Sequence, residues 1–275
     1  MTDHIVFDQV HYAYSPGQPV LKNINLTIRQ GEFIALIGGN GSGKTTLAKH
    51  CNGLYKPVAG TVRVGGRDTK TCSVAELVSQ AAYCYQNPDH QIFQSTVGEE
   101  VAFGPRNMGL PADEVESRVS EALQAVGLDQ LREEEPYFAS KGTRQKIAVA
   151  SILAMKPQAI ILDEPTTGLD HRGVEEMMSL IRKLHRDGHT ILVITHDMRL
   201  VAEYADRVLV LSQGEIICDD SPQAVFARPD LLAKAQVEPP AVCRFSLLAG
   251  LGEPLPLTLS ALKDRLAKEQ KGTYR

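Results

Sequence analysis

The sequence predicts an α/β fold organised around a parallel β-sheet, and three observations lead to this fold class. Three continuous apolar runs, at Phe33–Ile37, residues 159–162 and Thr190–Ile194, are typical of strands buried on both faces. Apolar residues at helical spacing separate the second run from the third, and Gly188 closes that helix. The first run ends in a glycine cluster, after which a helix is expected at about residues 43–51. This strand–helix–strand order is that of a parallel sheet with crossover helices.

An antiparallel β patch is expected near the N-terminus. Residues 5–14 and 20–28 are predicted strands on either side of the turn Ser15-Pro16-Gly17. Residues 61–64 add a third short strand before Gly65-Gly66. The three strands are expected to form one antiparallel patch.

The middle and the end of the chain are predicted to be mainly helical. Residues 88–156 carry no convincing strand pattern, and their helical face ending at Gly127 indicates a helical insertion. A hairpin is expected at residues 207–219. Beyond it, prolines interrupt the chain before a last amphipathic helix marked by Leu259, Leu262 and Leu266.

Composition and charge narrow the class of protein. The 275 residues are 43% hydrophobic and 23% charged, which is ordinary for a soluble globular protein. The net charge is −4 with no block of basic residues, so nucleic acid is not expected as a primary partner. No window approaches about 18 consecutive apolar residues, and residues 1–4 do not resemble a signal peptide, which predicts a cytoplasmic location. The five cysteines form no Cys-x-x-Cys pair, which favours reduced thiols over a disulfide framework or a zinc site.

The strongest motif is Gly38-Gly39-Asn40-Gly41-Ser42-Gly43-Lys44-Thr45, which matches the phosphate-binding pattern Gly-x-x-x-x-Gly-Lys-[Ser/Thr] between a predicted strand and a predicted helix. Glycines allow the backbone to wrap around phosphate oxygens and to point N–H groups at negative charge. Lys44 is expected to neutralise the β- and γ-phosphates, and the Thr45 hydroxyl to bind Mg²⁺. The predicted nucleotide-binding residues of this loop are Gly38, Asn40, Gly41, Ser42, Gly43, Lys44, Thr45 and Thr46.

Two adjacent carboxylates follow the predicted strand at residues 159–162. Because open α/β sheets bind ligands at the carboxyl edge of their strands, Asp163 and Glu164 are expected beside the phosphate loop. Asp163 suits a role in holding Mg²⁺, and Glu164 suits a general base that orients water toward the γ-phosphate. Such a pair alone is often a helix cap or a solvated pair, and the Lys44 motif is what favours catalysis.

Two further polar side chains are expected at the same edge. His196 follows the strand Thr190–Ile194 and could donate a hydrogen bond to the γ-phosphate. Gln86 follows an apolar and aromatic run, and its amide could reach Mg²⁺ or the attacking water. The predicted catalytic residues are therefore Glu164, His196 and Gln86, and the predicted metal-binding residues are Thr45, Gln86 and Asp163.

With these residues in order, residues 1–235 resemble an ATP-binding-cassette (ABC) ATPase. The segment Ser140-Lys141-Gly142-Thr143-Arg144-Gln145 stands where that family carries the signature Leu-Ser-Gly-Gly-Gln. The match is partial: Ala139 replaces Leu, Lys141 the first Gly and Thr143 the Gln, whereas Ser140 and Gly142 remain. The resemblance implies a RecA-like parallel sheet with an antiparallel β subdomain, and a helical subdomain at about residues 88–156.

The resemblance also implies roles for individual residues. Gln86 corresponds to the Q-loop, Thr167-Gly168-Leu169-Asp170 to the D-loop and His196 to the switch histidine. Tyr14 corresponds to the aromatic residue that stacks on adenine, with Tyr12 as the alternative.

Dimerisation follows from the same resemblance. In this family two subunits meet head to tail, so each ATP lies between the phosphate loop of one chain and the signature of the other. Ser140 and Gly142 would then contact the nucleotide that the partner chain holds. One sequence does not choose between two identical ATPases and two paralogues.

A narrower resemblance lies in residues 86–93 (Gln-Asn-Pro-Asp-His-Gln-Ile-Phe) and 101–105 (Val-Ala-Phe-Gly-Pro). They look like the ATPases of energy-coupling-factor importers, which take up vitamins or cobalt and nickel ions. This implies a peripheral protein on the cytoplasmic face of the membrane, with a transmembrane coupling subunit and a solute-binding membrane subunit as partners. The alternatives are another ABC importer, a soluble ABC ATPase acting on DNA or ribosomes, and a lone phosphate-loop kinase or GTPase. The transported solute is not readable from this chain.

Residues 236–275 lie beyond the cassette and carry more apolar side chains than a disordered tail would. They are expected to pack either on their own cassette or on their copy in the partner chain. Energy-coupling-factor ATPases resemble this arrangement, with a C-terminal helical extension that helps to hold the dimer together.

Overall fold

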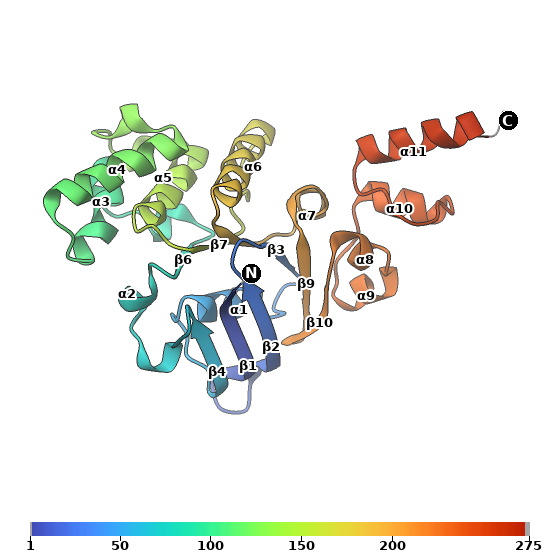
Figure 1. The fold of residues 1–275 in the computed structure, drawn as a ribbon, viewed down its shortest axis with the longest axis horizontal. Helices are drawn as coiled ribbons and strands as arrows, with labels where there is room; N and C mark the ends of the chain where they lie inside the picture. The colour runs from blue at the N-terminus through green and yellow to red at the C-terminus, as the bar shows by residue number, and fades with distance from the viewer. Residues whose placement is uncertain (1, 273–275) are drawn as a thin grey trace.

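The computed structural model describes residues 2–272, and its centre is a six-stranded sheet (Figure 1). The strand order is β10-β9-β3-β8-β7-β6, and all neighbours are parallel except the β9–β10 hairpin. The predicted parallel α/β sheet is therefore confirmed. Its strands are β3 (Phe33–Ile37), β6 (Ala81–Cys84), β7 (Ala159–Asp163), β8 (Thr190–Ile194), β9 (Arg207–Ser212) and β10 (Glu215–Asp220).

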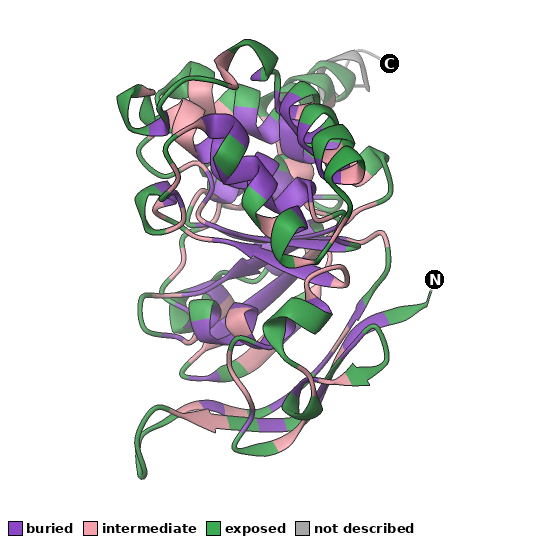
Figure 2. Cartoon of the chain, turned by 90° about the vertical axis from the view of Figure 1, so that its left-hand side faces the viewer, coloured by how far each residue is buried: buried purple, intermediate pink, exposed green. Residues whose placement is uncertain are grey.

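Both faces of this sheet are buried. Successive side chains of each strand point to opposite faces, so neighbouring residues join different apolar clusters. In β7, Ile160 and Leu162 join an apolar cluster with the helices on one side. Ile161, between them, joins a second cluster with the antiparallel strands on the other side. Figure 2 shows the buried residues concentrated in the sheet and in the layers that face it. The continuous apolar runs of the sequence follow from this double burial.

The predicted antiparallel patch is a four-stranded sheet with the order β2-β1-β4-β5. The pairing of β1 with β2 and of β1 with β4 is antiparallel throughout. A short β5, which the sequence pattern did not indicate, completes the sheet. Its strands are β1 (Asp3–Ala13), β2 (Pro19–Arg29), β4 (Ala59–Val64) and β5 (Arg67–Asp68).

Helices cover both faces of the parallel sheet. Helix α1 (Lys44–Cys51) follows β3 after the glycine-rich loop, and helix α2 (Val74–Leu77) precedes β6. Residues 88–156 contain helices and no strand; their three α-helices pack against one another in the layer that Figure 1 shows beside α6. The three helices are α3 (Val97–Asn107), α4 (Ala112–Val126) and α5 (Lys141–Leu153); α6 is His171–Arg186.

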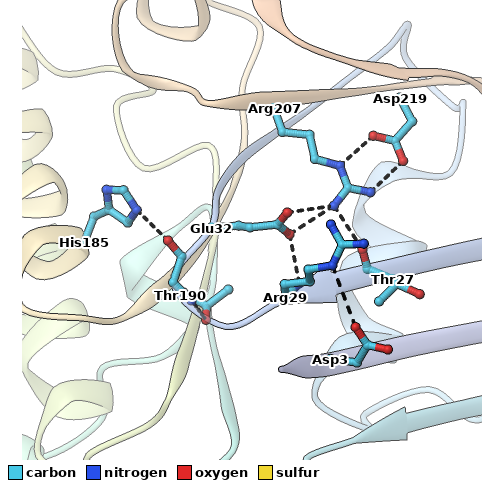
Figure 3. A network of polar contacts seen from close by, with 9 residues as sticks. Asp3, Thr27, Arg29, Glu32, His185, Thr190, Arg207 and Asp219 are labelled. Carbon is cyan, nitrogen blue, oxygen red and sulfur yellow. Dashed lines mark hydrogen bonds and ion pairs between the residues drawn. The ribbon is translucent and has the colours of Figure 1, made fainter. Parts of the chain in front are cut away.

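A charged network ties the antiparallel sheet to the parallel sheet at the end opposite the glycine-rich loop (Figure 3). The guanidinium of Arg207, at the start of β9, donates to Oε2 of Glu32 at 3.0 Å and to Oδ1 of Asp219 at 2.6 Å. It also donates to the backbone carbonyl of Thr27 on β2 at 3.0 Å. Both carboxylates raise the pKa of Arg207, with Asp219 as the larger cause, although burial opposes the shift. The network fixes the positions of the two sheets relative to each other.

The segment that follows β10 is only partly buried against the rest of the described chain. Cys243 and Leu255 are buried in the apolar cluster that also contains Phe226 and the edge of the parallel sheet. In contrast, Phe245 and Leu248 are 53% and 84% exposed. The elements are α7 (Met198–Tyr204), α8 (Pro222–Phe226), α9 (Pro229–Lys234), α10 (Ala241–Leu248) and α11 (Leu259–Gly272). The proline pattern indicated a broken region here, and the structure shows that each proline at 222, 229 and 240 starts or precedes a short helix.

Across residues 2–272, no helix has both the length and the apolar character that crossing a bilayer requires.

Candidate active site

The glycine-rich loop joins the end of β3 to the start of α1, as its motif predicts. A Cβ atom on Gly38 would lie 2.1 Å from the carbonyl oxygen of Leu211 on β9, so only glycine fits there. Gly43 precedes the helix with a φ of 105° and offers no side-chain cap to its first N–H groups. These N–H groups, at the positive end of the helix dipole, are free to bind phosphate oxygens.

Lys44 is folded across the loop. Its Nζ donates to the carbonyl oxygens of Gly38 and Gly39 at 2.8 and 2.9 Å, and the residue is 7% exposed. Burial lowers the pKa of Lys44, whereas the carboxylates of Glu164 and Asp163 act in the opposite direction. The ammonium therefore interacts electrostatically with both the predicted general base, Glu164, and the predicted metal-binding residue, Asp163.

The loop and the end of β7 also present oxygen atoms suited to a hard cation and a phosphate. The Thr45 hydroxyl donates to Oδ2 of Asp163 at 2.9 Å. The hydroxyl of Ser42 is buried and has no hydrogen-bond partner, so the loop has a polar atom that a phosphate oxygen would satisfy. Hydroxyl and carboxylate oxygens are the ligands that Mg²⁺ prefers, usually with nucleotide phosphates completing its shell. These residues fit a Mg²⁺–nucleotide complex.

The other two predicted catalytic residues, Gln86 and His196, both contact the carboxylate of Glu164. Nε2 of Gln86 donates to its Oε2 at 2.7 Å, and Nε2 of His196 lies 2.9 Å from its Oε1. The Thr167 hydroxyl also donates to Oε2 at 2.9 Å, a contact that the sequence did not indicate. The backbone φ of Glu164 is 48°, a conformation that side-chain-bearing residues rarely adopt and that is often retained at functional sites. The carboxylate is thus held by donors from three loops, at the exits of β6, β7 and β8.

Tyr83 is a site residue that sequence reasoning missed. Its hydroxyl donates to Oδ2 of Asp163 at 2.6 Å, from the adjacent strand β6. Burial and the carboxylate of Asp163 raise the pKa of Tyr83, so the phenol stays protonated and acts as a donor. The sequence feature that could have indicated this contact is a tyrosine within a buried strand, because a buried phenol usually needs a hydrogen-bond partner.

The segment that follows Gln86 is anchored to the helical layer through Gln91. Its Oε1 accepts from the backbone N–H of Tyr85 at 3.3 Å. Its Nε2 donates to the carbonyl of Ala148 at 2.8 Å and to the Ser151 hydroxyl at 2.9 Å, both on α5. Movement of α5 would therefore reach the strand end that carries Gln86.

Of the two tyrosines considered for adenine stacking, Tyr14 lies next to the phosphate loop. Its hydroxyl is 2.8 Å from that of Thr46, and the residue is 58% exposed. Tyr12 is instead enclosed by other rings: it stacks on Tyr55 at 5.3 Å and meets His50 edge-on at 4.7 Å. Tyr14 therefore has the more accessible ring face.

The structure does not bring the predicted signature and D-loop residues into contact with the phosphate loop of the same chain. Within residues 2–272, the side-chain hydrogen bonds of Ser140 are with Thr143, because Ser140 caps α5. Asp170 caps α6 by accepting from the N–H of Gly173 at 2.7 Å. Gly142 faces Leu169, whose side chain would lie 3.7 Å from an added Cβ. The exposed helix start at Ser140 is free to meet another chain.

Comparison with known proteins identifies the family. The family profile described as ABC transporter matches residues 21–167. The chain is 41% identical over 250 residues to the energy-coupling factor transporter ATP-binding protein EcfA of Methanocaldococcus jannaschii, and the match covers 90% of each protein. The chain spans 42%, 43% and 45% of the length of three other curated relatives, described as putative ABC transporter ATP-binding proteins. It is therefore about half as long as those proteins.

Two solved structures share the fold. One is cbiO1 from Clostridium perfringens, described as part of the ABC transporter complex cbiONQ; it has a TM-score of 0.77 and 35% identity and covers 91% of this chain and all of its own. The other is the ATP-binding cassette MJ0796, a dimer in a post-hydrolysis state bound to ADP and Pi. It has a TM-score of 0.71 and 28% identity over 79% of this chain and 98% of its own. The chain belongs to the ABC transporter family, as one of its ATP-binding cassette ATPase domains.

Proposed function

We propose that this chain is the ATP-hydrolysing motor of an energy-coupling-factor importer. It would drive the uptake of a vitamin or of a cobalt or nickel ion through membrane partner subunits, from the cytoplasmic face of the membrane. The observation that carries the proposal is the convergence of Gln86 and His196 on Glu164, next to a complete phosphate loop. The likeness to EcfA and to cbiO1 supports the importer type.

In the proposed reaction, Glu164 accepts a proton from the water that attacks the γ-phosphate. Gln86 and His196 contact the carboxylate of Glu164, and from there they would orient the attacking water and the γ-phosphate oxygens. Lys44 neutralises the β- and γ-phosphates. Thr45 and Asp163, with Gln86, would hold Mg²⁺, which neutralises phosphate charge when it is bound.

We further propose that two cassettes, residues 1–235 of each chain, close over ATP head to tail. The N-terminus of α5 supports this, because Ser140 is exposed there and its only side-chain hydrogen bonds within the described residues are the capping contacts with Thr143. ATP would join the two chains through its γ-phosphate. Hydrolysis removes that contact, so ATP and ADP differ in affinity for the closed dimer, as a motor requires.

Ser140→Arg tests the assignment of Ser140 to the partner's nucleotide. The isolated chain is expected to bind ATP with unchanged affinity, whereas ATP-induced dimerisation and turnover are lost, because the long cation cannot fit at a γ-phosphate contact. Equilibrium binding and light scattering measure the two effects. Ser73→Arg is the control, since it removes a comparable exposed cap, at α2, at a cost of about 1 kcal/mol. Loss of ATP affinity in the Ser140→Arg monomer would refute the trans assignment.

The docking site for the membrane subunit is proposed in the groove beyond Gln86. Phe93 and Phe103 are 56% and 40% exposed and meet edge-on at 4.7 Å. They line a cavity of about 360 Å³ with the apolar side chains of Val74 and Met155. Exposed aromatic rings around an apolar cavity are typical of protein interaction sites.

Co-purification tests both the groove and the importer role. The full tagged chain is expected to be recovered from detergent-solubilised membranes of its host with integral membrane proteins, and Phe103→Glu is expected to abolish this. Phe138→Glu is the matched control, because Phe138 is 87% exposed in the helical layer and does not line the groove. Recovery on ribosomes or DNA instead would favour a soluble ABC ATPase.

The extension, residues 236–275, is proposed to join the two chains when nucleotide is absent. Its apolar side chains at Phe245 and Leu248 are exposed although Cys243 and Leu255 are in the core of the same chain. Leu248→Glu is therefore a sharper test than truncation, which would also remove the core residues. We expect Leu248→Glu to weaken nucleotide-free dimerisation at least tenfold by light scattering, with an unchanged melting temperature. Arg244→Glu, on the same helix, is the control. An unchanged dimer would contradict the proposal.

A further inference from the structure

Tyr83 links the strand that leads to Gln86 with the carboxylate proposed to hold Mg²⁺. Its hydroxyl donates to Oδ2 of Asp163 at 2.6 Å, and Tyr83 and Asp163 are 7% and 4% exposed. The parallel register pairs Tyr83 with Ile161. Since Ile161 and Asp163 are two residues apart in β7, they share the face of the sheet on which Tyr83 and α1 also lie.

Two donors share one oxygen of Asp163. Oδ2 accepts from Tyr83 and, at 2.9 Å, from the Thr45 hydroxyl of α1. Oδ1 of Asp163 accepts no hydrogen bond from the described residues. The carboxylate is therefore held at one oxygen from two elements, and the other oxygen is left for a cation or for a water bound to it.

The ring of Tyr83 is itself held in place. It meets the ring of Tyr85 edge-on, with centroids 5.1 Å apart. A phenol carries a single donor and, in this buried position, has little freedom to turn to another partner. A residue that donates to a metal-binding carboxylate typically orients it, and its loss costs roughly 10–100-fold in metal affinity or activity.

We propose that Tyr83 is a positioning residue for the divalent cation: it fixes Asp163 through Oδ2 so that Oδ1 is available to the metal. This rests on the proposed function, because it deepens the role of Asp163 there. Tyr83 lies three residues before Gln86, so the segment that leaves the same strand carries a second residue proposed for the metal site. A cation bound at Asp163 would thus be coupled to the strand that positions Gln86.

Tyr83→Phe tests this, because it keeps the ring and removes only the hydroxyl. The wild-type and variant chains are titrated with Mn²⁺ in the presence of a non-hydrolysable ATP analogue, and free Mn²⁺ is measured by electron paramagnetic resonance. We expect Mn²⁺ to bind roughly tenfold more weakly in the variant. Affinity for the analogue in EDTA and the nucleotide-free melting temperature should be unchanged. Tyr85→Phe is the matched control and should leave Mn²⁺ affinity within twofold of wild type.

A second measurement does not depend on the variant folding. With 3-fluorotyrosine at position 83, the ¹⁹F resonance should shift more on adding Mg²⁺ with the analogue than on adding the analogue in EDTA. The same label at position 85 should show a smaller difference.

Four outcomes would contradict the proposal, in different ways. Unchanged Mn²⁺ affinity in Tyr83→Phe, or a ¹⁹F resonance at position 83 that ignores Mg²⁺, overturns the positioning role. An equal loss of analogue affinity in EDTA overturns it too, since Tyr83 would then act on the nucleotide pocket as a whole. Failure of the wild type to bind the analogue with any dependence on Mn²⁺ would overturn the proposed function itself, and that result appears before any variant is made.

Discussion

Glu164→Gln is expected to lower ATP turnover by roughly 10²–10⁴-fold, the usual contribution of a general base, while ATP binding persists. The amide keeps the shape of the carboxylate but cannot take a proton from water. Its oxygen can still accept from Gln86 and from Thr167, which now donate to Oε2 of the carboxylate at 2.7 and 2.9 Å. Its N–H₂ can face Nε2 of His196 when the histidine adopts the tautomer with that nitrogen unprotonated.

Because these contacts survive, the variant is expected to accumulate as an ATP-bound dimer. Phosphate release measures the loss of turnover, and light scattering with ATP and Mg²⁺ measures the trapped dimer. Glu133→Gln is a suitable control, since Glu133 is an exposed carboxylate in the helical layer with an 88% exposed side chain. Hydrolysis at the wild-type rate in Glu164→Gln would refute the assignment of Glu164 as the base.

The parallel sheet and the phosphate loop could be predicted from sequence because their signals are local. A strand buried on both faces is apolar at every position, and β3, β7 and β8 are buried throughout. The glycine pattern of residues 38–43 is required by the backbone itself, as the close approach of Gly38 to Leu211 illustrates. Such requirements determine the residue types within one short segment, so they can be recognised without knowing which distant segments lie nearby.

Contacts between distant segments could not be predicted in this way. The hydrogen bond of Tyr83 to Asp163 depends on β6 lying next to β7 with Tyr83 paired to Ile161, which no local pattern encodes. The burial of Cys243 and Leu255 against the cassette is similar, because apolar residues spaced among prolines fit either their own fold or a partner. The sequence already favoured Tyr14 over Tyr12, and tertiary packing adds a second reason: Tyr12 stacks on Tyr55 and meets His50 edge-on, whereas Tyr14 meets Tyr55 only edge-on.

Lys44→Ala is expected to reduce ATP affinity itself, by at least tenfold, and turnover with it. The reason is that the ammonium neutralises phosphate charge in the ground state as well as in the transition state, so its removal weakens binding before chemistry begins. In the structure the same ammonium donates to the carbonyls of Gly38 and Gly39. The contact with Gly38 is buried and the contact with Gly39 is part-buried, so the substitution also removes a donor from inside the loop.

The matched control for Lys44→Ala is Lys49→Ala, which removes a positive charge from the same helix. Nζ of Lys49 lies over the ring of Tyr55 at 5.4 Å and is not part of the phosphate loop. If any positive charge on α1 attracted ATP through long-range electrostatics, both variants would lose affinity and the loss would fade in high salt, because screening acts over about 10 Å at 0.1 M. If Lys44 contacts the phosphates directly, its loss should exceed that of Lys49 at every ionic strength. Isothermal titration calorimetry with ATP at two salt concentrations separates the two explanations. Unchanged affinity in Lys44→Ala would rule out the assignment of residues 38–45 as the phosphate loop.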